Sequence, residues 1–147
     1  MDLSILLVQY RPDEGELRRT LASLLRQSCR DFELVVADDG SDEDFFPLTR
    51  QILAENGFTG AKFVKLTPNG GTVKNVLNGA KQAAGKWVFT VSPGDYLYDA
   101  DTVAWLLEVL RRDAPRVAFG RLACYEDRNG APKNLCASKF LPWWNKY

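Results

Sequence analysis

The chain of 147 residues contains no histidine, and its 19 lysines and arginines are balanced by 19 aspartates and glutamates. Without histidine there is no Ser-His or Cys-His nucleophile pair, no imidazole general base and no zinc site with imidazole ligands. A net charge of zero removes the overall attraction that draws proteins to nucleic acids or anionic membranes. Any proton or metal chemistry must therefore rest mainly on carboxylates, and we expect no nucleic-acid partner.

Cysteines and long hydrophobic runs are also scarce. Cys29, Cys124 and Cys136 are widely spaced and form no C-x-x-C pair, which predicts reduced thiols rather than disulfides or a zinc ribbon. The first apolar run, Leu3 to Val8, is shorter than a signal peptide or a membrane span requires. These features predict a cytoplasmic protein, with peripheral contact at the inner face of the membrane left open.

Strand-length apolar runs alternate along the chain with helix-length amphipathic runs. This alternation is typical of an α/β fold with a largely parallel sheet, and the length predicts one domain. The predicted strands are residues 3–8, 32–37, 61–66 and 87–91, with a fifth at 116–125. The predicted helices are one capped by residue 13, one started by Ser41 with Asp44 that runs to about 56, one from about 72 through 84, and one capped by 99 or 101 that ends before 115.

Polar residues and glycines gather at the carboxyl ends of the predicted strands, where an open parallel sheet binds its ligands. Singly, each such segment is a common helix cap or turn, but together they favour a binding site. The segments are Gln9-Tyr10-Arg11, Asp38-Asp39-Gly40-Ser41, residues 67–71 and Ser92-Pro93-Gly94-Asp95.

Three familiar α/β functions do not fit these segments. The loop after the first strand lacks the G-x-G-x-x-G of dinucleotide-binding folds, and no Walker A sequence is present. A phosphoacceptor receiver domain would carry its acidic pair after the first strand, whereas Asp38 and Asp39 follow the second. Nicotinamide-dependent oxidoreduction, P-loop phosphoryl transfer and phosphoacceptor signalling are therefore disfavoured.

Three segments, in order along the chain, resemble the opening of glycosyltransferase family 2, whose members have the GT-A fold. They are Ser4 to Tyr10, Leu21 to Ser28 and Asp31 to Ser41. The similarity continues through residues 69–80, 84–89 and 94–97 and covers roughly residues 3 to 112. It implies a Rossmann-like, mostly parallel sheet flanked by helices. It also implies one domain over residues 1–147 that is truncated on the acceptor side, with the donor-binding part at about 1–115 and an acceptor-side hairpin and tail at about 116–147.

The resemblance also implies roles for single residues at the donor site. Tyr10 lies where the family stacks an aromatic ring on the nucleobase, and Asp39 lies where it accepts a hydrogen bond from the uracil edge. Lys74 replaces the usual arginine and would meet the donor diphosphate, and Asp95 occupies the last acid of the D-x-D-type metal motif. Each has an ordinary alternative as a cap, turn, packing or solvated residue. The expected donor-binding set is Tyr10, Asp38, Asp39, Gly40, Asn69, Lys74 and Asp95, with Asp95 as the metal ligand.

A divalent cation fits this composition, because Mg²⁺ and Mn²⁺ prefer oxygen ligands and neutralise the charge of a departing diphosphate. The chain departs from the family here, since Ser92 and Gly94 stand where many members have acids. Asp95 is left alone, which predicts weak metal binding without donor. Arg11 likewise replaces the asparagine that usually follows the tyrosine. In the family the catalytic base lies beyond the aligned segment, so we expect it to be absent from this chain and assign no residue to it.

The resulting hypothesis is a metal-assisted, inverting transfer of a sugar from a nucleotide-diphosphate sugar, with a UDP-sugar expected, to a glycan or lipid-linked acceptor in polysaccharide or glycoconjugate biosynthesis. The alternative is a catalytically silent nucleotide-sugar-binding or interaction module that lacks the general base. A further expectation concerns residues 131–147, which contain aromatic residues and lysines but no acid. This tail predicts self-association.

Overall fold

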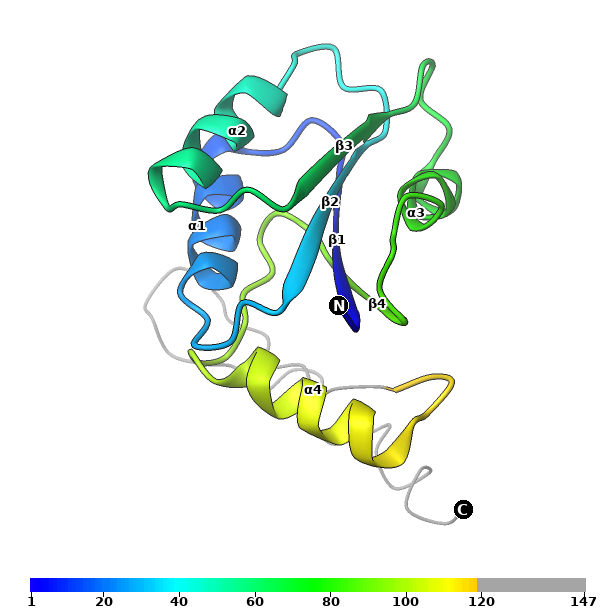
Figure 1. The fold of residues 1–147 in the computed structure, drawn as a ribbon. Helices are drawn as coiled ribbons and strands as arrows, with labels where there is room; N and C mark the ends of the chain where they lie inside the picture. Colours follow the sequence, from blue (N-terminus) through cyan, green and yellow to red (C-terminus); the bar gives the residue numbers. More distant parts are fainter. Residues whose placement is uncertain (119–147) are drawn as a thin grey trace, which may run out of the picture. The chain divides into compact units, whose positions relative to one another are not determined.

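The computed structural model describes residues 1–118 of the chain, of which Met1–Asp113 form one compact unit. In that unit four parallel strands form a sheet in the order β3-β2-β1-β4, and helices connect them (Figure 1). The predicted parallel α/β architecture is confirmed. The elements are β1 (Leu3–Gln9), α1 (Glu14–Leu25), β2 (Phe32–Asp38), α2 (Phe46–Glu55), β3 (Ala61–Lys65), α3 (Thr72–Ala80), β4 (Trp87–Val91) and α4 (Thr102–Asp113).

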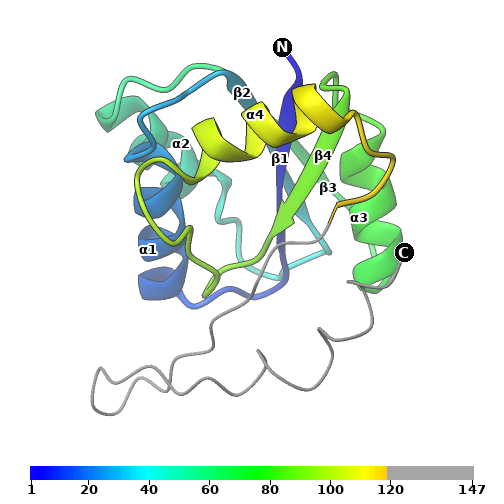
Figure 2. The same cartoon turned by 90° about the horizontal axis from the view of Figure 1, so that it is seen from below.

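The two central strands, β1 and β2, are buried along their whole length because helices cover both faces of the sheet. Successive side chains of a strand point to opposite faces. Leu3, Ile5 and Leu7 share a core with leucines of α1 and with apolar residues of α2 and α4. Leu6 and Val8 belong to a smaller apolar cluster with Val76 of α3. Figures 1 and 2 show α1 and α3 on opposite sides of the sheet.

Local sequence signals predict the start of the first helix and not that of the second. Asp13 caps α1 as predicted, and its Oδ1 accepts a hydrogen bond from the Glu16 N–H at 2.9 Å. The prediction that Ser41 with Asp44 starts α2 is wrong, because the helix begins at Phe46, with Pro47 in its first turn. Asp44 instead lies outside the helix and accepts a hydrogen bond from the Phe46 N–H at 3.0 Å.

The prediction that α3 runs through Ala84 is also wrong, because the helix ends at Ala80. The chain leaves the helix to bond with the sheet. The Ala84 N–H donates to Glu33 Oε1 at 2.5 Å, and the Gly85 N–H donates to Ser4 Oγ at 2.9 Å. These long-range bonds take the place of further helical ones.

The fifth predicted strand, residues 116–125, is not formed in its described part, because residues 116–118 have no strand conformation. Its remainder and the tail at 131–147 lie outside the described residues. Over the part of the chain that the structure describes, no helix is long and apolar enough to span a bilayer.

Candidate functional site

Two clefts open at the carboxyl ends of the strands. The first cleft, about 380 Å³, lies between the loop after β1, the start of α3 and the loop after β4. The second cleft, about 430 Å³, lies between the loops that follow β2 and β3. Tyr10 borders both, and its side chain is about half exposed. Volumes of this size suit a small ligand, and their position is the one expected for an open parallel sheet.

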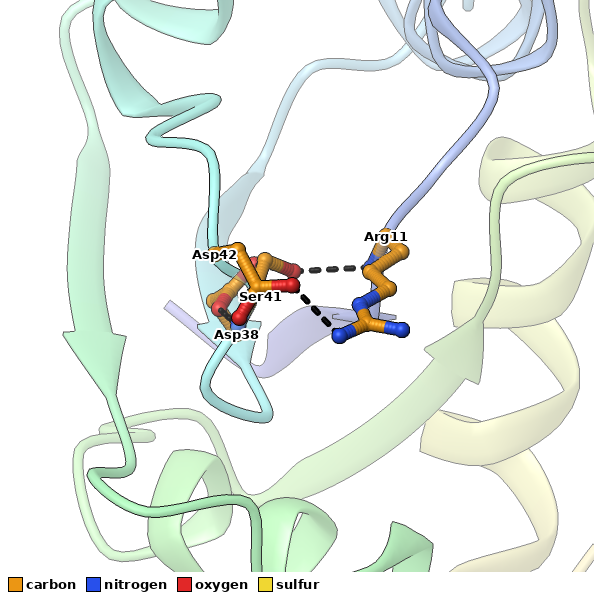
Figure 3. A network of polar contacts seen from close by, with 4 residues as sticks. All are labelled: Arg11, Asp38, Ser41 and Asp42. Atoms are coloured by element: carbon orange, nitrogen blue, oxygen red, sulfur yellow. Dashed lines mark hydrogen bonds and ion pairs between the residues drawn. The ribbon is translucent and has the colours of Figure 1, made fainter.

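Asp38, the last residue of β2, holds the loops together rather than facing either cleft (Figure 3). Its side chain is 1% exposed. It accepts hydrogen bonds from Gln9 Nε2 at 3.1 Å, from the Ser41 N–H at 2.7 Å and from Ser41 Oγ at 2.8 Å. Ser41 Oγ in turn accepts from the Arg11 N–H at 2.8 Å. The loops after β1 and β2 are thereby fastened to each other.

Asp39, the next residue, lines the first cleft. Its Oδ1 accepts a hydrogen bond from the Gly70 N–H at 2.8 Å, which ties it to the loop after β3. Among the described residues, its other carboxylate oxygen has no hydrogen-bond donor. This oxygen is not among the buried polar atoms that lack a partner, so it is accessible and can accept a hydrogen bond from a ligand in the cleft.

Gly40 follows these two acids and lets the chain turn at the second cleft. Its φ of +77° is one that residues with a side chain rarely adopt. A Cβ added here would lie 2.8 Å from the Asn69 backbone nitrogen. Gly40 and Asn69 both line the second cleft. The close approach of these two loops therefore requires glycine at this position.

Tyr10 and Arg11 stand between the two clefts. The Arg11 guanidinium carbon lies 5.1 Å from the centroid of the Tyr10 ring, and the guanidinium is paired with Asp42, which borders the second cleft (Figure 3). Arg11 itself lines the first cleft and has a φ of +45°. The cation covers one face of the Tyr10 ring, so a nucleobase can stack on the other face.

The other two predicted site residues lie at the margin. Lys74 is exposed on α3 and lines neither cleft. Asp95 is exposed in the turn after β4, where its Oδ2 accepts from the Ser92 N–H at 2.8 Å. Ser92 lines the first cleft, so the Asp95 turn forms part of its border. The structure thus brings Tyr10, Asp39 and the Asp95 turn to one cleft and leaves Lys74 outside it.

Two buried amides without a predicted ligand role also line the first cleft, Gln9, which the sequence places only in the polar segment after the first strand, and Asn75. Asn75 Nδ2 donates to the Ala37 carbonyl at 2.9 Å, and Gln9 Nε2 donates to Asp38. Their carbonyl oxygens, Gln9 Oε1 and Asn75 Oδ1, are buried without a hydrogen-bond partner in the part of the chain that the structure describes. No sequence signal separates these amides from ordinary core polar residues, because their bonds join distant parts of the chain.

The acids of the site offer one carboxylate at the expected metal position. Within residues 1–118 no three Asp, Glu or Cys side chains are grouped so that they could hold a metal ion. Asp95 is exposed, and among the described residues only its Oδ2 takes a hydrogen bond from the protein. The donor set therefore fits a hard cation shared with the phosphates of a ligand, and it does not fit a closed protein-only site.

Comparison with known proteins is consistent with this geometry. The model of the family described as glycosyl transferase family 2 matches residues 4–146. PGL/p-HBAD biosynthesis glycosyltransferases of Mycobacterium tuberculosis and Mycobacterium bovis are 35% identical over 85 residues, which is 57% of this chain and 32% of theirs. The match spans about a third of the length of these curated relatives.

Solved structures of glycosyltransferases share the fold. S. aureus TarS superposes with a TM-score of 0.66 at 26% identity, over 78% of this chain and 20% of that one. Its fragment 1–349 in complex with UDP-GlcNAc gives 0.62 at 26% identity, over 76% and 32%. The mannosyltransferase PcManGT of Pyrobaculum calidifontis, with GDP-Man and Mn²⁺, gives 0.65 at 21% identity, over 74% and 32%, and supports the fold alone. The expected GT-A fold is confirmed.

Proposed function

Because the chain belongs to glycosyltransferase family 2, we propose that its first cleft binds the nucleotide of a nucleotide-diphosphate sugar, with UDP as the nucleotide. The protein transfers the sugar to a glycan or lipid-linked acceptor with inversion, in polysaccharide or glycoconjugate biosynthesis. One observation carries the proposal. Tyr10 and Asp39, which the family resemblance assigns to the nucleobase, line the same cleft, and one Asp39 oxygen is left without a donor by the described residues.

Each of these residues has a physical task. The exposed Tyr10 ring offers a stacking surface, and base-aromatic stacking is worth about 1–3 kcal/mol. Asp39 accepts the N–H of the base edge, while the Gly70 N–H fixes the orientation of its carboxylate. Asp38 and Gly40 shape and hold the loop that carries Asp39. In this proposal Asp38 supports the loop, instead of contacting the ligand as the sequence had predicted.

A divalent cation, Mg²⁺ or Mn²⁺, would be held by Asp95 together with the donor phosphates, and it would supply positive charge to the leaving diphosphate. Asp95 would contribute its other carboxylate oxygen, while its Oδ2 is oriented by the Ser92 N–H. No described residue is assigned as the catalytic base. The cytoplasmic location expected from the sequence stays a prediction.

Calorimetric titration of the full chain with UDP in Mn²⁺ tests the proposal. Asp39→Asn keeps the shape of the side chain and removes its charge. We expect it to lower UDP affinity at least about tenfold, because hydrogen bonds to charged groups are worth about 1.5–3 kcal/mol. Glu43→Gln, an acid-to-amide change at an exposed position, is the matched control and should leave affinity unchanged. No binding at millimolar UDP, or equal binding by Asp39→Asn, would contradict the proposal.

The second candidate is a nucleotide-sugar-binding module without catalysis. The lone Asp95 at the metal position favours it. Slow hydrolysis of a UDP-sugar to UDP separates the two candidates, because a silent module binds the donor but does not turn it over. Hydrolysis that disappears in Asp95→Asn would exclude the silent module, whereas binding without any hydrolysis would favour it.

A further inference from the structure

The charged residues that line the first cleft are unevenly divided. Asp13, Glu16 and Asp39 are acids, and among the described residues of that lining Arg11 is the single cation. A nucleoside diphosphate brings further negative charge into the same space. Its binding therefore needs a counter-charge, and within the described lining only Arg11 provides one. The family resemblance assigns no role to this residue.

The backbone of Arg11 is fixed by a hydrogen bond, whereas its exposed guanidinium can change its partner. The Arg11 N–H is fixed by Ser41 Oγ at 2.8 Å. The guanidinium lies over the Tyr10 ring and pairs with Asp42. Both partners of that pair are open to solvent, with 59% of the Arg11 side chain and 79% of the Asp42 side chain exposed.

An exposed pair of this kind is weak because water and salt screen it. A diphosphate presents more charge than one carboxylate and matches the planar fork of a guanidinium. Arg11 borders the first cleft, while Asp42 borders the second. A diphosphate in the first cleft would therefore compete with Asp42 for the Arg11 guanidinium.

We propose that Arg11 is a second cationic contact for the donor diphosphate, exchanged from Asp42 when the donor binds, and that it makes nucleotide binding partly independent of a divalent metal. The inference rests on the proposed function and extends it. Where the metal motif retains a single carboxylate, Asp95, the guanidinium supplies positive charge from the lining of the cleft itself. Arg11 thereby offsets the depleted metal motif.

Three variants separate this role from a structural one. Arg11→Asn removes the charge and suits the φ of +45°, because asparagine tolerates the left-handed region better than most residues. Arg11→Lys keeps the charge and loses the fork. Asp42→Asn removes the competing carboxylate and leaves Arg11 in place.

UDP and uridine are titrated into the full chain by calorimetry, each with Mn²⁺ and with EDTA. We expect Arg11→Asn to lower UDP affinity in EDTA about tenfold, the size of one charge-assisted hydrogen bond, and to leave uridine affinity unchanged. Arg11→Lys should lose less UDP affinity in EDTA than Arg11→Asn, because it keeps the positive charge. Asp42→Asn should bind UDP about two- to threefold more tightly, in keeping with the loss of a weak exposed pair.

The outcomes distinguish the inference from the proposed function. If wild-type chain binds UDP in Mn²⁺ but not in EDTA, or if Arg11→Asn weakens uridine and UDP equally, the inference is overturned and the proposed function stands. Unchanged or weaker UDP binding by Asp42→Asn also overturns it. If the wild-type chain binds no UDP even in Mn²⁺, the proposed function fails, and the inference fails with it.

Discussion

Two acids at opposite ends of the sheet are equally buried and have different surroundings. Glu33 near the start of β2 and Asp39 just after its end are each 4% exposed. Glu33 accepts hydrogen bonds from Ser4 Oγ at 2.6 Å, the Ala84 N–H at 2.5 Å and Lys62 Nζ at 2.9 Å. Asp39 accepts one, from the Gly70 N–H, among the described residues. Burial therefore does not distinguish the two carboxylates, whereas the number of hydrogen bonds that each accepts does.

The end of the sheet around Glu33, called the saturated end because this carboxylate accepts three hydrogen bonds, stabilises the fold. Burial by itself raises the pKa of Glu33, but the hydrogen bonds from Ser4, Ala84 and Lys62 outweigh it and lower the pKa to about 2. These bonds join β1, β2, β3 and the segment after α3. The unsaturated end, around Asp39, is left available for a ligand.

Breaking the saturated end should have the largest effect. Glu33→Gln keeps the shape but leaves bonded donors facing an uncharged amide. We expect the free energy of unfolding to fall by about 3 kcal/mol, the upper range for a broken buried charged bond. Urea denaturation measures this change, with Glu43→Gln, expected within about 0.5 kcal/mol of wild type, as the control. A Glu33→Gln chain that is still folded should bind UDP like wild type. Loss of UDP binding by the folded variant would contradict the assignment of stability to Glu33 and of ligand binding to the Asp39 end.

The same carboxylate makes stability depend on pH. The folded-state pKa of Glu33, about 2, lies below its ordinary value of 4.5. A depressed pKa contributes stability that is fully present above pH 4.5 and is lost as the pH falls toward 2. Wild-type and Glu33→Gln chains should therefore converge in stability over this window. Parallel urea midpoints from pH 6 to about pH 2 would contradict this.

Breaking the ligand end through its backbone should have an intermediate effect. Gly40→Ala adds a Cβ 2.8 Å from the Asn69 nitrogen at a φ of +77°. We expect about 2 kcal/mol of destabilisation, of which about 1–2 is the left-handed strain, and weaker UDP binding as the Asp39 loop moves. Gly57→Ala is the matched control, because its φ is +65° and nothing lies within 4 Å of the added Cβ. Equal losses in the two variants would show that the contact with Asn69 has no cost.

The smallest effect is expected at an exposed ion pair. Arg18 Nε donates to Glu14 Oε1 at 2.9 Å across one turn of α1, and both side chains are about half exposed. Arg18→Gln should cost only about 0.3–0.5 kcal/mol and leave UDP affinity unchanged. Urea denaturation in low and high salt checks this, because the small loss should vanish in salt. A loss comparable to that of Glu33→Gln would mean that exposed pairs matter here as much as buried ones.

The sequence predicted what local chemistry decides. Strand β1 reads as an uninterrupted apolar run because it is buried on both faces, and Asp13 with Glu16 marks the start of α1. The end of α3 was not predictable in this way. It depends on bonds from Ala84 and Gly85 to Glu33 and Ser4, which lie far away in the sequence.

The candidate site shows the same limit. The gathering of Tyr10 and Asp39 at one edge follows from parallel strands, and the structure brings them to one cleft. The sequence could not separate Asp38 from Asp39, since both are acids at the same strand end. Their difference comes from their partners, since Asp38 is bonded by Ser41 and by Gln9, 29 positions away, whereas Asp39 is bonded by the Gly70 N–H. The assigned ligand roles of Tyr10, Asp39, Lys74 and Asp95 stay predictions.

The bonds from Gln9 and Ser41 to Asp38, and from Arg11 to Ser41, have a consequence for the thermodynamics of recognition. They make the loops after β1 and β2 one wall whose position is set when the chain folds. A ligand that stacks on Tyr10 and bonds to Asp39 then meets two groups already held at a fixed spacing. Little conformational entropy is lost on binding when a surface is preorganised. Folding of the loops therefore lowers in advance the entropy cost of binding such a ligand.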